Sequence, residues 1–104
     1  MFAIRPGHRY VLANFEDQLK DGQTLQFIEK VPAAEGSTEL VTIFDGTTNE
    51  EVLAMLIDRL NYLQGKFPCR ENAIAITHIE TALLWLNHRT ANRKARGVEG
   101  KQIA

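Results

Sequence analysis

The first half of the chain carries short runs in which apolar and polar residues alternate, a pattern typical of half-buried strands. Two such runs cover residues 10–15 and 24–31, and a third run, residues 40–44, is short and almost wholly apolar. In the second run Leu25 and Phe27 share one face. Asp21-Gly22 is a turn signal between the first two runs. The pattern predicts an N-terminal antiparallel sheet of about three strands within residues 1–46.

The second half changes to the spacing of two amphipathic helices. The apolar residues of the first helix are Val52, Leu53, Leu56, Ile57, Leu60 and Leu63. Thr48 and Glu51 form a capping box that begins this helix. Thr47 with Glu50 is an equally good box one residue earlier, and Gly65 is placed to end the helix.

A second, longer helix is expected to open with Pro68 and to continue without a breaker to Gly97. Its main apolar stripe consists of Ile76, Ile79, Leu83 and Leu86, and the apolar residues off that stripe are Ile74, Leu84 and Trp85. Together these elements predict an α+β chain, residues 1–104, treated as a single domain. It divides into strands (1–46), a helical hairpin (47–100) and a short tail (101–104).

The length of the second helix bears on assembly. Residues 68–96 would form a helix about 43 Å long, whereas a compact domain of about 100 residues has a radius of gyration of roughly 13 Å. Because apolar residues lie on more than one side of this helix, we expect it to associate with the helices of other copies. The alternative is that the helix breaks or frays near Asn87 and leaves the tail disordered.

Composition excludes several classes of protein. The hydrophobic content of 44% and the charged content of 24% are those of a folded globular chain. A net charge of -1 argues against a protein that coats duplex DNA. One cysteine is too few for a disulfide framework or a cysteine-rich zinc site. No apolar run is long enough for a membrane span or a secretory signal, so a reducing cytosol is the expected compartment.

The charges are unevenly distributed. After His88 the basic residues are Arg89, Arg93, Lys94, Arg96 and Lys101, against a single acid, Glu99. Arg5 and Arg9 precede the first acid of the chain, Glu16. Two basic ends favour a local anion site over a general nucleic-acid surface.

Catalytic motifs are missing from the sequence. Cys69 has no evident base beside it. His78 and His88 lie about 15 Å apart on different faces of the predicted helix, so they cannot bind one metal ion within a chain. The chain has no phosphate loop and no dinucleotide-binding glycine motif. We therefore expect no enzyme activity, no metal and no cofactor.

The basic end of the second helix is more specific. Arg89, Arg93 and Arg96 are spaced i, i+4, i+7 and share one helical face. Arginine can bind phosphate oxygens through two parallel hydrogen bonds. Gly97 and Gly100 would let the following backbone approach a ligand closely. The alternative is a solvated helix end whose cations complement the helix dipole, and spacing alone leaves both open.

Aromatic residues that could stack on a base are Tyr62, Phe67 and Trp85. Phe67 and Trp85 are better suited to a core or an interface, whereas Tyr62 lies beside the polar Asn61 and Gln64. Tyr62 is therefore the aromatic candidate for a nucleotide site.

The helical half carries a combination of motifs that resembles a known family. The stretch GTTNEEVLAMLIDRLNYLQGKFPCRENAIAITHIETALLWLNHRTANRKARGVEG contains EN-x-x-AI, LxWLNxRTxxR and RGVEG. It resembles the phage anti-Thoeris sponge family (Thoeris anti-defence protein 1). The hairpin is also similar to that of the phage anti-CBASS cyclic-nucleotide sponge. The likeness spans residues 46–100 and extends more loosely to RPGHRYVLANFE and LQFIEK in the strands.

The resemblance implies a phage immune-evasion protein that binds nucleotides and is not an enzyme. Members sequester, without cleaving, glycocyclic ADP-ribose isomers made by bacterial TIR proteins. Some members also hold cyclic di- or trinucleotides in a separate site. They assemble through their helices into dimers and hexamers. The expected setting is the cytoplasm of the infected bacterium, with no membrane and no nucleic acid as partner.

The resemblance also assigns residues. Asn72 and Arg89 match polar positions of the ADP-ribose pocket, and Tyr62 falls where an aromatic ring is expected to stack on adenine. Arg93, in the same motif as Arg89, is an expected phosphate partner.

Two further groups come from the resemblance. His8 and Arg9 are the candidates for the basic N-terminal residues that the family draws to the pocket. Arg96, Gly97 and Val98 would belong to the second nucleotide site.

Geometry adds one inference to the resemblance. Asn72 and Arg89 are 17 residues apart, which is about 25 Å along one helix. If both bind one small nucleotide, they must come from different chains with helices packed antiparallel. The main alternative function is a small nucleic-acid-binding or scaffold protein that uses the same basic ends. A third alternative, an enzyme acting on a nucleotide, finds no nucleophile or base in this sequence to support it.

Overall fold

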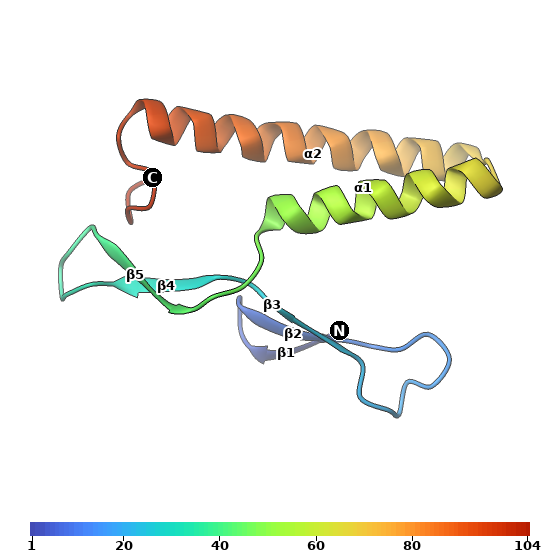
Figure 1. Ribbon diagram of the computed structural model, residues 1–104, viewed down its shortest axis with the longest axis horizontal. Coiled ribbons are helices and arrows are strands. Elements are labelled where there is room, and N and C mark those ends of the chain that lie inside the picture. The colour runs from blue at the N-terminus through green and yellow to red at the C-terminus, as the bar shows by residue number, and fades with distance from the viewer. The chain divides into compact units, whose positions relative to one another are not determined.

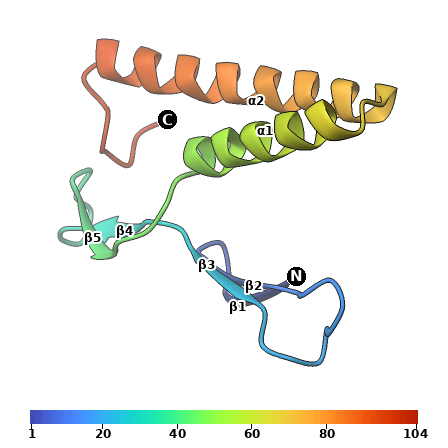
Figure 2. The ribbon, with the colours of Figure 1, turned by 45° about the vertical axis from the view of Figure 1, so that its right-hand side comes forward.

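The computed structural model describes residues 1–104, which form two units, 1–48 and 49–104 (Figures 1 and 2). The strands of the first unit are β1 (Phe2–Arg5), β2 (Arg9–Leu12), β3 (Gln23–Gln26), β4 (Glu29–Pro32) and β5 (Leu40–Phe44). The second unit consists of the helices α1 (Asn49–Lys66) and α2 (Arg70–Ala95). Antiparallel strands followed by a helical hairpin with a long second helix confirm the predicted fold class.

The first three strands form one antiparallel sheet in the order β1-β2-β3. The turn from β1 to β2 contains Pro6 and Gly7, and the amide of His8 donates to the carbonyl of Arg5 at 2.9 Å. Gly7 has φ +82°, as the third residue of a type II turn requires. The sequence pattern did not predict β1, although Pro-Gly before a short alternating run indicates such a turn.

The run predicted as one strand over 24–31 is divided between two sheets. The amide of Phe27 donates to the carbonyl of His8 at 2.7 Å, whereas the amide of Ile28 donates to the carbonyl of Thr47 at 2.9 Å. Beyond this switch of partner, β4 pairs with β5 in a separate antiparallel sheet. Alternation of side chains continues across the switch, so it cannot reveal that the backbone has changed neighbours.

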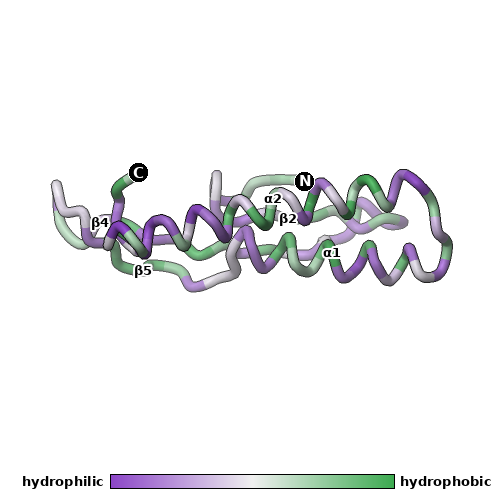
Figure 3. Tube along the Cα trace, turned by 90° about the horizontal axis from the view of Figure 1, so that it is seen from above, coloured by the Kyte–Doolittle hydropathy of each residue, from purple (hydrophilic) through white to green (hydrophobic).

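The two helices of the second unit pack along a seam with alternating steps of three and four residues. The buried and half-buried positions in these steps are Glu50, Leu53, Ile57, Leu60 and Gln64 on α1, and Asn72, Ile76, Ile79, Leu83, Leu86, Thr90 and Arg93 on α2. This spacing is that of a coiled coil. Hydrophobic and hydrophilic residues alternate along both helices (Figure 3). Ile76 lies deepest among the apolar residues, with 8% of its surface exposed.

The helix boundaries follow from local chemistry. α1 begins directly after Thr48, the start that the Thr48–Glu51 pair predicts. α2 begins two residues later than predicted, because Cys69 caps it: its Sγ accepts a hydrogen bond from the amide of Asn72 at 3.4 Å. Gln64 bridges the turn, donating to the carbonyl of Cys69 at 2.9 Å and accepting from its amide at 3.0 Å.

α2 continues through Asn87 to Ala95, so the alternative of a break near Asn87 is wrong. With 26 residues against 18 in α1, α2 is about 12 Å longer than its partner helix. Large apolar residues lie outside the seam, as expected: Ile74, Leu84 and Trp85 are exposed, Trp85 by 65%. Neither helix combines the length and the apolar character needed to cross a membrane.

The seam position of Ile76 makes a first prediction. Ile76→Ala should lower the free energy of unfolding by about 2–5 kcal/mol, because it removes buried methyl groups and leaves a cavity. Leu19→Ala is the control, since Leu19 is fully exposed, and should change stability by less than about 0.5 kcal/mol. Denaturant unfolding of both variants measures the difference, and equal losses would contradict the position of the seam.

Candidate functional site

Two of the predicted ligand residues lie at the turn end of the hairpin. Tyr62 is in the last turns of α1, with 59% of its surface exposed, and the Lys66 ammonium lies 5.3 Å from its ring centroid. Asn72 lies in the first turn of α2 and is half-buried. An exposed ring beside a cation can receive an adenine base by stacking.

Arg89 lies far from this end. It is exposed near the end of α2, and the unbroken helix holds it about 25 Å from Asn72. The structure therefore does not bring Asn72 and Arg89 of one chain to the same small molecule.

A shallow, open depression lies on the first turns of α2. Its volume is about 350 Å³, and its lining residues are Arg70, Ala73, Ile74, Thr77 and His78. Further along the same helix, Trp85 and His88 touch edge to face with ring centroids 5.8 Å apart. No group of three histidine, cysteine, aspartate or glutamate side chains lies close enough to hold a metal ion.

Arg93 has internal partners. It is 6% exposed, and its guanidinium donates to the carbonyls of Val98 at 3.0 Å, of Lys101 at 2.6 Å and of Ile103. These bonds hold residues 97–104, here called the C-terminal segment, against the end of α2. Gly97, with φ +70°, allows the reversal of the chain. Although the i, i+4 spacing predicts a shared helical face, Arg89 is exposed and Arg93 is buried against the C-terminal segment.

Arg96 caps α2 and also contacts the C-terminal segment. Its Nε donates to Oδ1 of Asn92 at 2.9 Å, and its Nη2 donates to the carbonyl of Ala104 at 2.6 Å. The predicted second-site residues Arg96, Gly97 and Val98 are therefore neighbours in one structured turn. Arg93 is bonded to that turn.

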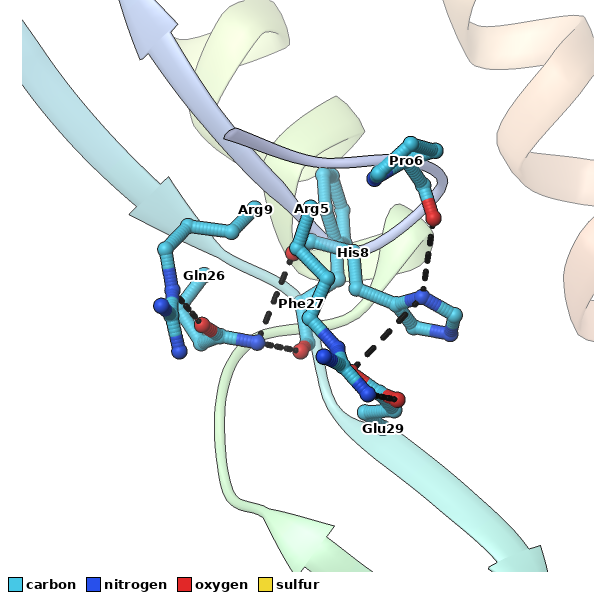
Figure 4. A network of polar contacts seen from close by, with 7 residues as sticks. All are labelled: Arg5, Pro6, His8, Arg9, Gln26, Phe27 and Glu29. Carbon is cyan, nitrogen blue, oxygen red and sulfur yellow. Dashed lines mark hydrogen bonds and ion pairs between the residues drawn. The ribbon is translucent and has the colours of Figure 1, made fainter. Parts of the chain in front are cut away.

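A second polar network lies in the first unit (Figure 4). Arg5 donates to Glu29 through Nε at 2.5 Å and through Nη2 at 2.7 Å, and Nδ1 of His8 lies 3.8 Å from the same carboxylate. Arg9 donates through Nε to Oε1 of Gln26 at 2.5 Å. The predicted residues His8 and Arg9 thus lie beside one another, at the junction of the two sheets.

Glu29 is buried, with 4% of its surface exposed. Hydrogen bonds from Arg5 hold the pKa of the Glu29 carboxyl below its ordinary value, and the same pair raises the pKa of Arg5. The ring of Phe44 completes the network, with the Cζ atoms of Arg5 and Arg9 at 5.5 and 5.0 Å from its centroid.

Sequence reasoning missed Glu29, Gln26 and Phe44. The available signal was the face formed by Leu25 and Phe27, which Glu29 continues two residues later. An acid in line with an apolar face indicates a buried charge that needs a cationic partner.

Comparison with known proteins shows which family this chain is similar to. A family model described as the hairpin domain of Acb2/Tad1 matches residues 25–91. Thoeris anti-defense 1 of Bacillus phage SBSphiJ7 is 60% identical over 57 residues, which cover 54% of this chain. The matched part spans 40% of the length of that relative.

The contacts of Arg93 generate a prediction. Arg93→Ala should release the C-terminal segment, because three carbonyls lose a charged donor. Trypsin should then cut after Arg96 and Lys101 several times faster, as measured by mass spectrometry. Arg89→Ala removes a tryptic site from the same helix without touching the segment and should leave these rates unchanged. Equal rates in the two variants would contradict the anchoring role.

The Arg5–Glu29 pair predicts a pH dependence. Because the folded-state pKa of Glu29 lies below its ordinary value of 4.5, the pair stabilises the fold above that pH. Its contribution is lost as the pH falls below 4.5 through the folded-state pKa. Thermal unfolding between pH 7 and pH 3 should therefore show a steeper loss in the wild type than in Glu29→Gln. Parallel curves would rule out this linkage.

Proposed function

Because the chain belongs to the Acb2/Tad1 hairpin family, we propose that it is a phage anti-Thoeris protein that sequesters a signalling nucleotide without cleaving it. Its likeness to Thoeris anti-defense 1 of a Bacillus phage supports this role. The ligands proposed first are the glycocyclic ADP-ribose isomers made by TIR proteins in the cytoplasm of the infected bacterium.

The chemistry of the hairpin suits such a ligand. An ADP-ribose isomer offers an adenine, hydroxyl groups and two phosphates. Tyr62 supplies an exposed ring for the base, and Arg89 supplies an unburied guanidinium for phosphate. Asn72 can exchange hydrogen bonds with a hydroxyl group or with the base.

The observation that carries the proposal of a site shared between chains is the separation of Asn72 and Arg89 along an unbroken helix. A ligand smaller than about 25 Å reaches both only where two antiparallel copies of α2 meet. The exposed Ile74, Leu84 and Trp85 supply apolar surface for that contact. We therefore propose a homo-oligomer, a dimer or a hexamer, whose pockets are shared between chains.

A second nucleotide site is proposed at the end of α2, for cyclic di- or trinucleotides. Arg96, Gly97 and Val98 form the turn that would contact the ligand. Arg93 supports this turn from inside. A phosphate would reach the Arg93 guanidinium only if the C-terminal segment moved away.

Release of an intact ligand tests sequestration. Purified full-length protein is mixed with a glycocyclic ADP-ribose isomer, separated from free nucleotide, and denatured by heat. The mass spectrum of the supernatant should show the unmodified nucleotide. A hydrolysed product would indicate an enzyme, and no retained nucleotide would overturn the proposal.

Arg89→Ala tests the site within the same experiment. The variant should bind more weakly by about 1.5–3 kcal/mol, because a phosphate loses a charge-assisted hydrogen bond. Lys94→Ala removes the same charge from the same exposed end and should change affinity little. Equal losses, together with a steep dependence on salt, would indicate the diffuse polyanion binding of a nucleic-acid protein.

A further inference from the structure

The β1–β2 ladder places two like charges opposite each other. Arg5 and Arg9 are directly paired residues of the antiparallel ladder. Like charges in this position destabilise a sheet unless other groups compensate them. One buried carboxylate, Glu29, is available to the two guanidinium groups, so the compensation is unequal.

Arg5 binds both oxygens of that carboxylate. Its Nε and Nη2 bind the two oxygens of Glu29 at 2.5 and 2.7 Å, which is the bidentate geometry. The Glu29 side chain is 6% exposed, and the arrangement fixes the Arg5 guanidinium at the sheet junction.

Arg9 is held by a neutral hydrogen-bond partner. Its Nε donates to the neutral side chain of Gln26, whereas the Nε of Arg5 donates to a carboxylate oxygen of Glu29. Gln26 is itself oriented by donating to the carbonyl of Phe27 at 2.6 Å. The ring of Phe44 supports the Arg9 guanidinium at 5.0 Å. The two terminal nitrogens of Arg9 therefore form a positioned fork that fits two oxygens of a phosphate.

We propose that Glu29 is a positioning residue for phosphate binding. Because Glu29 binds Arg5, Gln26 remains the hydrogen-bond partner of Arg9. Arg9 then presents its terminal nitrogens to a phosphate-bearing ligand. Figure 4 shows Arg5 directed to Glu29 and Arg9 directed to Gln26. The inference rests on the proposed function in one respect, because Arg9 and His8 are the candidates that this unit contributes to nucleotide binding.

The sign of a substitution effect separates positioning from charge. If Glu29 acted only through its negative charge, Glu29→Gln would tighten the binding of an anion. If Glu29 restrains Arg5, the same change lets Arg5 compete for Gln26 and should weaken binding about tenfold. Glu35→Gln is the matched control, because Glu35 is exposed in a loop of the same unit.

A double variant tests the route through Arg5. In Arg5→Gln/Glu29→Gln the competing guanidinium is gone, so the binding lost in Glu29→Gln should return, although the protein has one cation fewer. A charge effect predicts the opposite order. Two glutamines can also hydrogen-bond to each other, so the double variant should fold even if Glu29→Gln alone does not. Its affinity then still tests the role of Arg5.

The experiment titrates inorganic pyrophosphate into full-length protein and follows the Arg9 Nε–H signal by NMR. The wild type and Glu35→Gln should show a saturable shift, Glu29→Gln a shift about tenfold weaker in affinity, and the double variant near-wild-type affinity. No shift in the wild type, or tighter binding by Glu29→Gln, would overturn the inference. A parallel titration with a glycocyclic ADP-ribose isomer separates the two proposals, because its failure alone would overturn only the proposed function.

Discussion

The uninterrupted course of α2 is the constraint on which the proposed nucleotide site depends. A helix fixes the distance between its residues, so Asn72 and Arg89 stay about 25 Å apart whatever the ligand does. The hairpin also leaves large apolar residues outside its seam. Both features become intelligible if copies of the chain pack through their helices and bind nucleotides between them. In that proposal assembly is part of the binding site, because a single hairpin would not complete it.

The two polar networks use arginine in the same two ways. Arg93 and Arg5 each bind groups of the fold: Arg93 donates to carbonyls of the C-terminal segment, and Arg5 donates to the Glu29 carboxylate. Each of these two arginines has a second arginine nearby: Arg89 precedes Arg93 by one helical turn, and Arg9 lies across the ladder from Arg5. The first member of each pair binds the fold, and the second member is the one proposed to bind an anion. This division explains why basic residues cluster at both ends of a chain whose net charge is near zero.

The sequence predicted the helical hairpin well, because capping chemistry and helical periodicity are local properties. Thr48, the seam stripe around Ile76 and the exposed Trp85 all follow from spacing. The strands were less predictable, since alternation across Phe27 and Ile28 does not show that the backbone changes partner there. The fate of Arg93 could not be predicted either. Spacing places Arg93 on the same face as Arg89. Its burial depends on the C-terminal segment, which reverses direction at Gly97 and packs against the end of α2.

Subunit complementation tests the central claim, a nucleotide site shared between chains, most directly. Asn72→Ala and Arg89→Ala chains are unfolded together, refolded as a mixture, and titrated with a glycocyclic ADP-ribose isomer, with native mass spectrometry confirming mixed oligomers. The account predicts that each variant alone binds poorly. The mixture should regain tight sites, because some interfaces then combine an intact Asn72 from one chain with an intact Arg89 from another. Confirmed mixed oligomers that regain no binding, or tight binding by a lone wild-type chain, would contradict it.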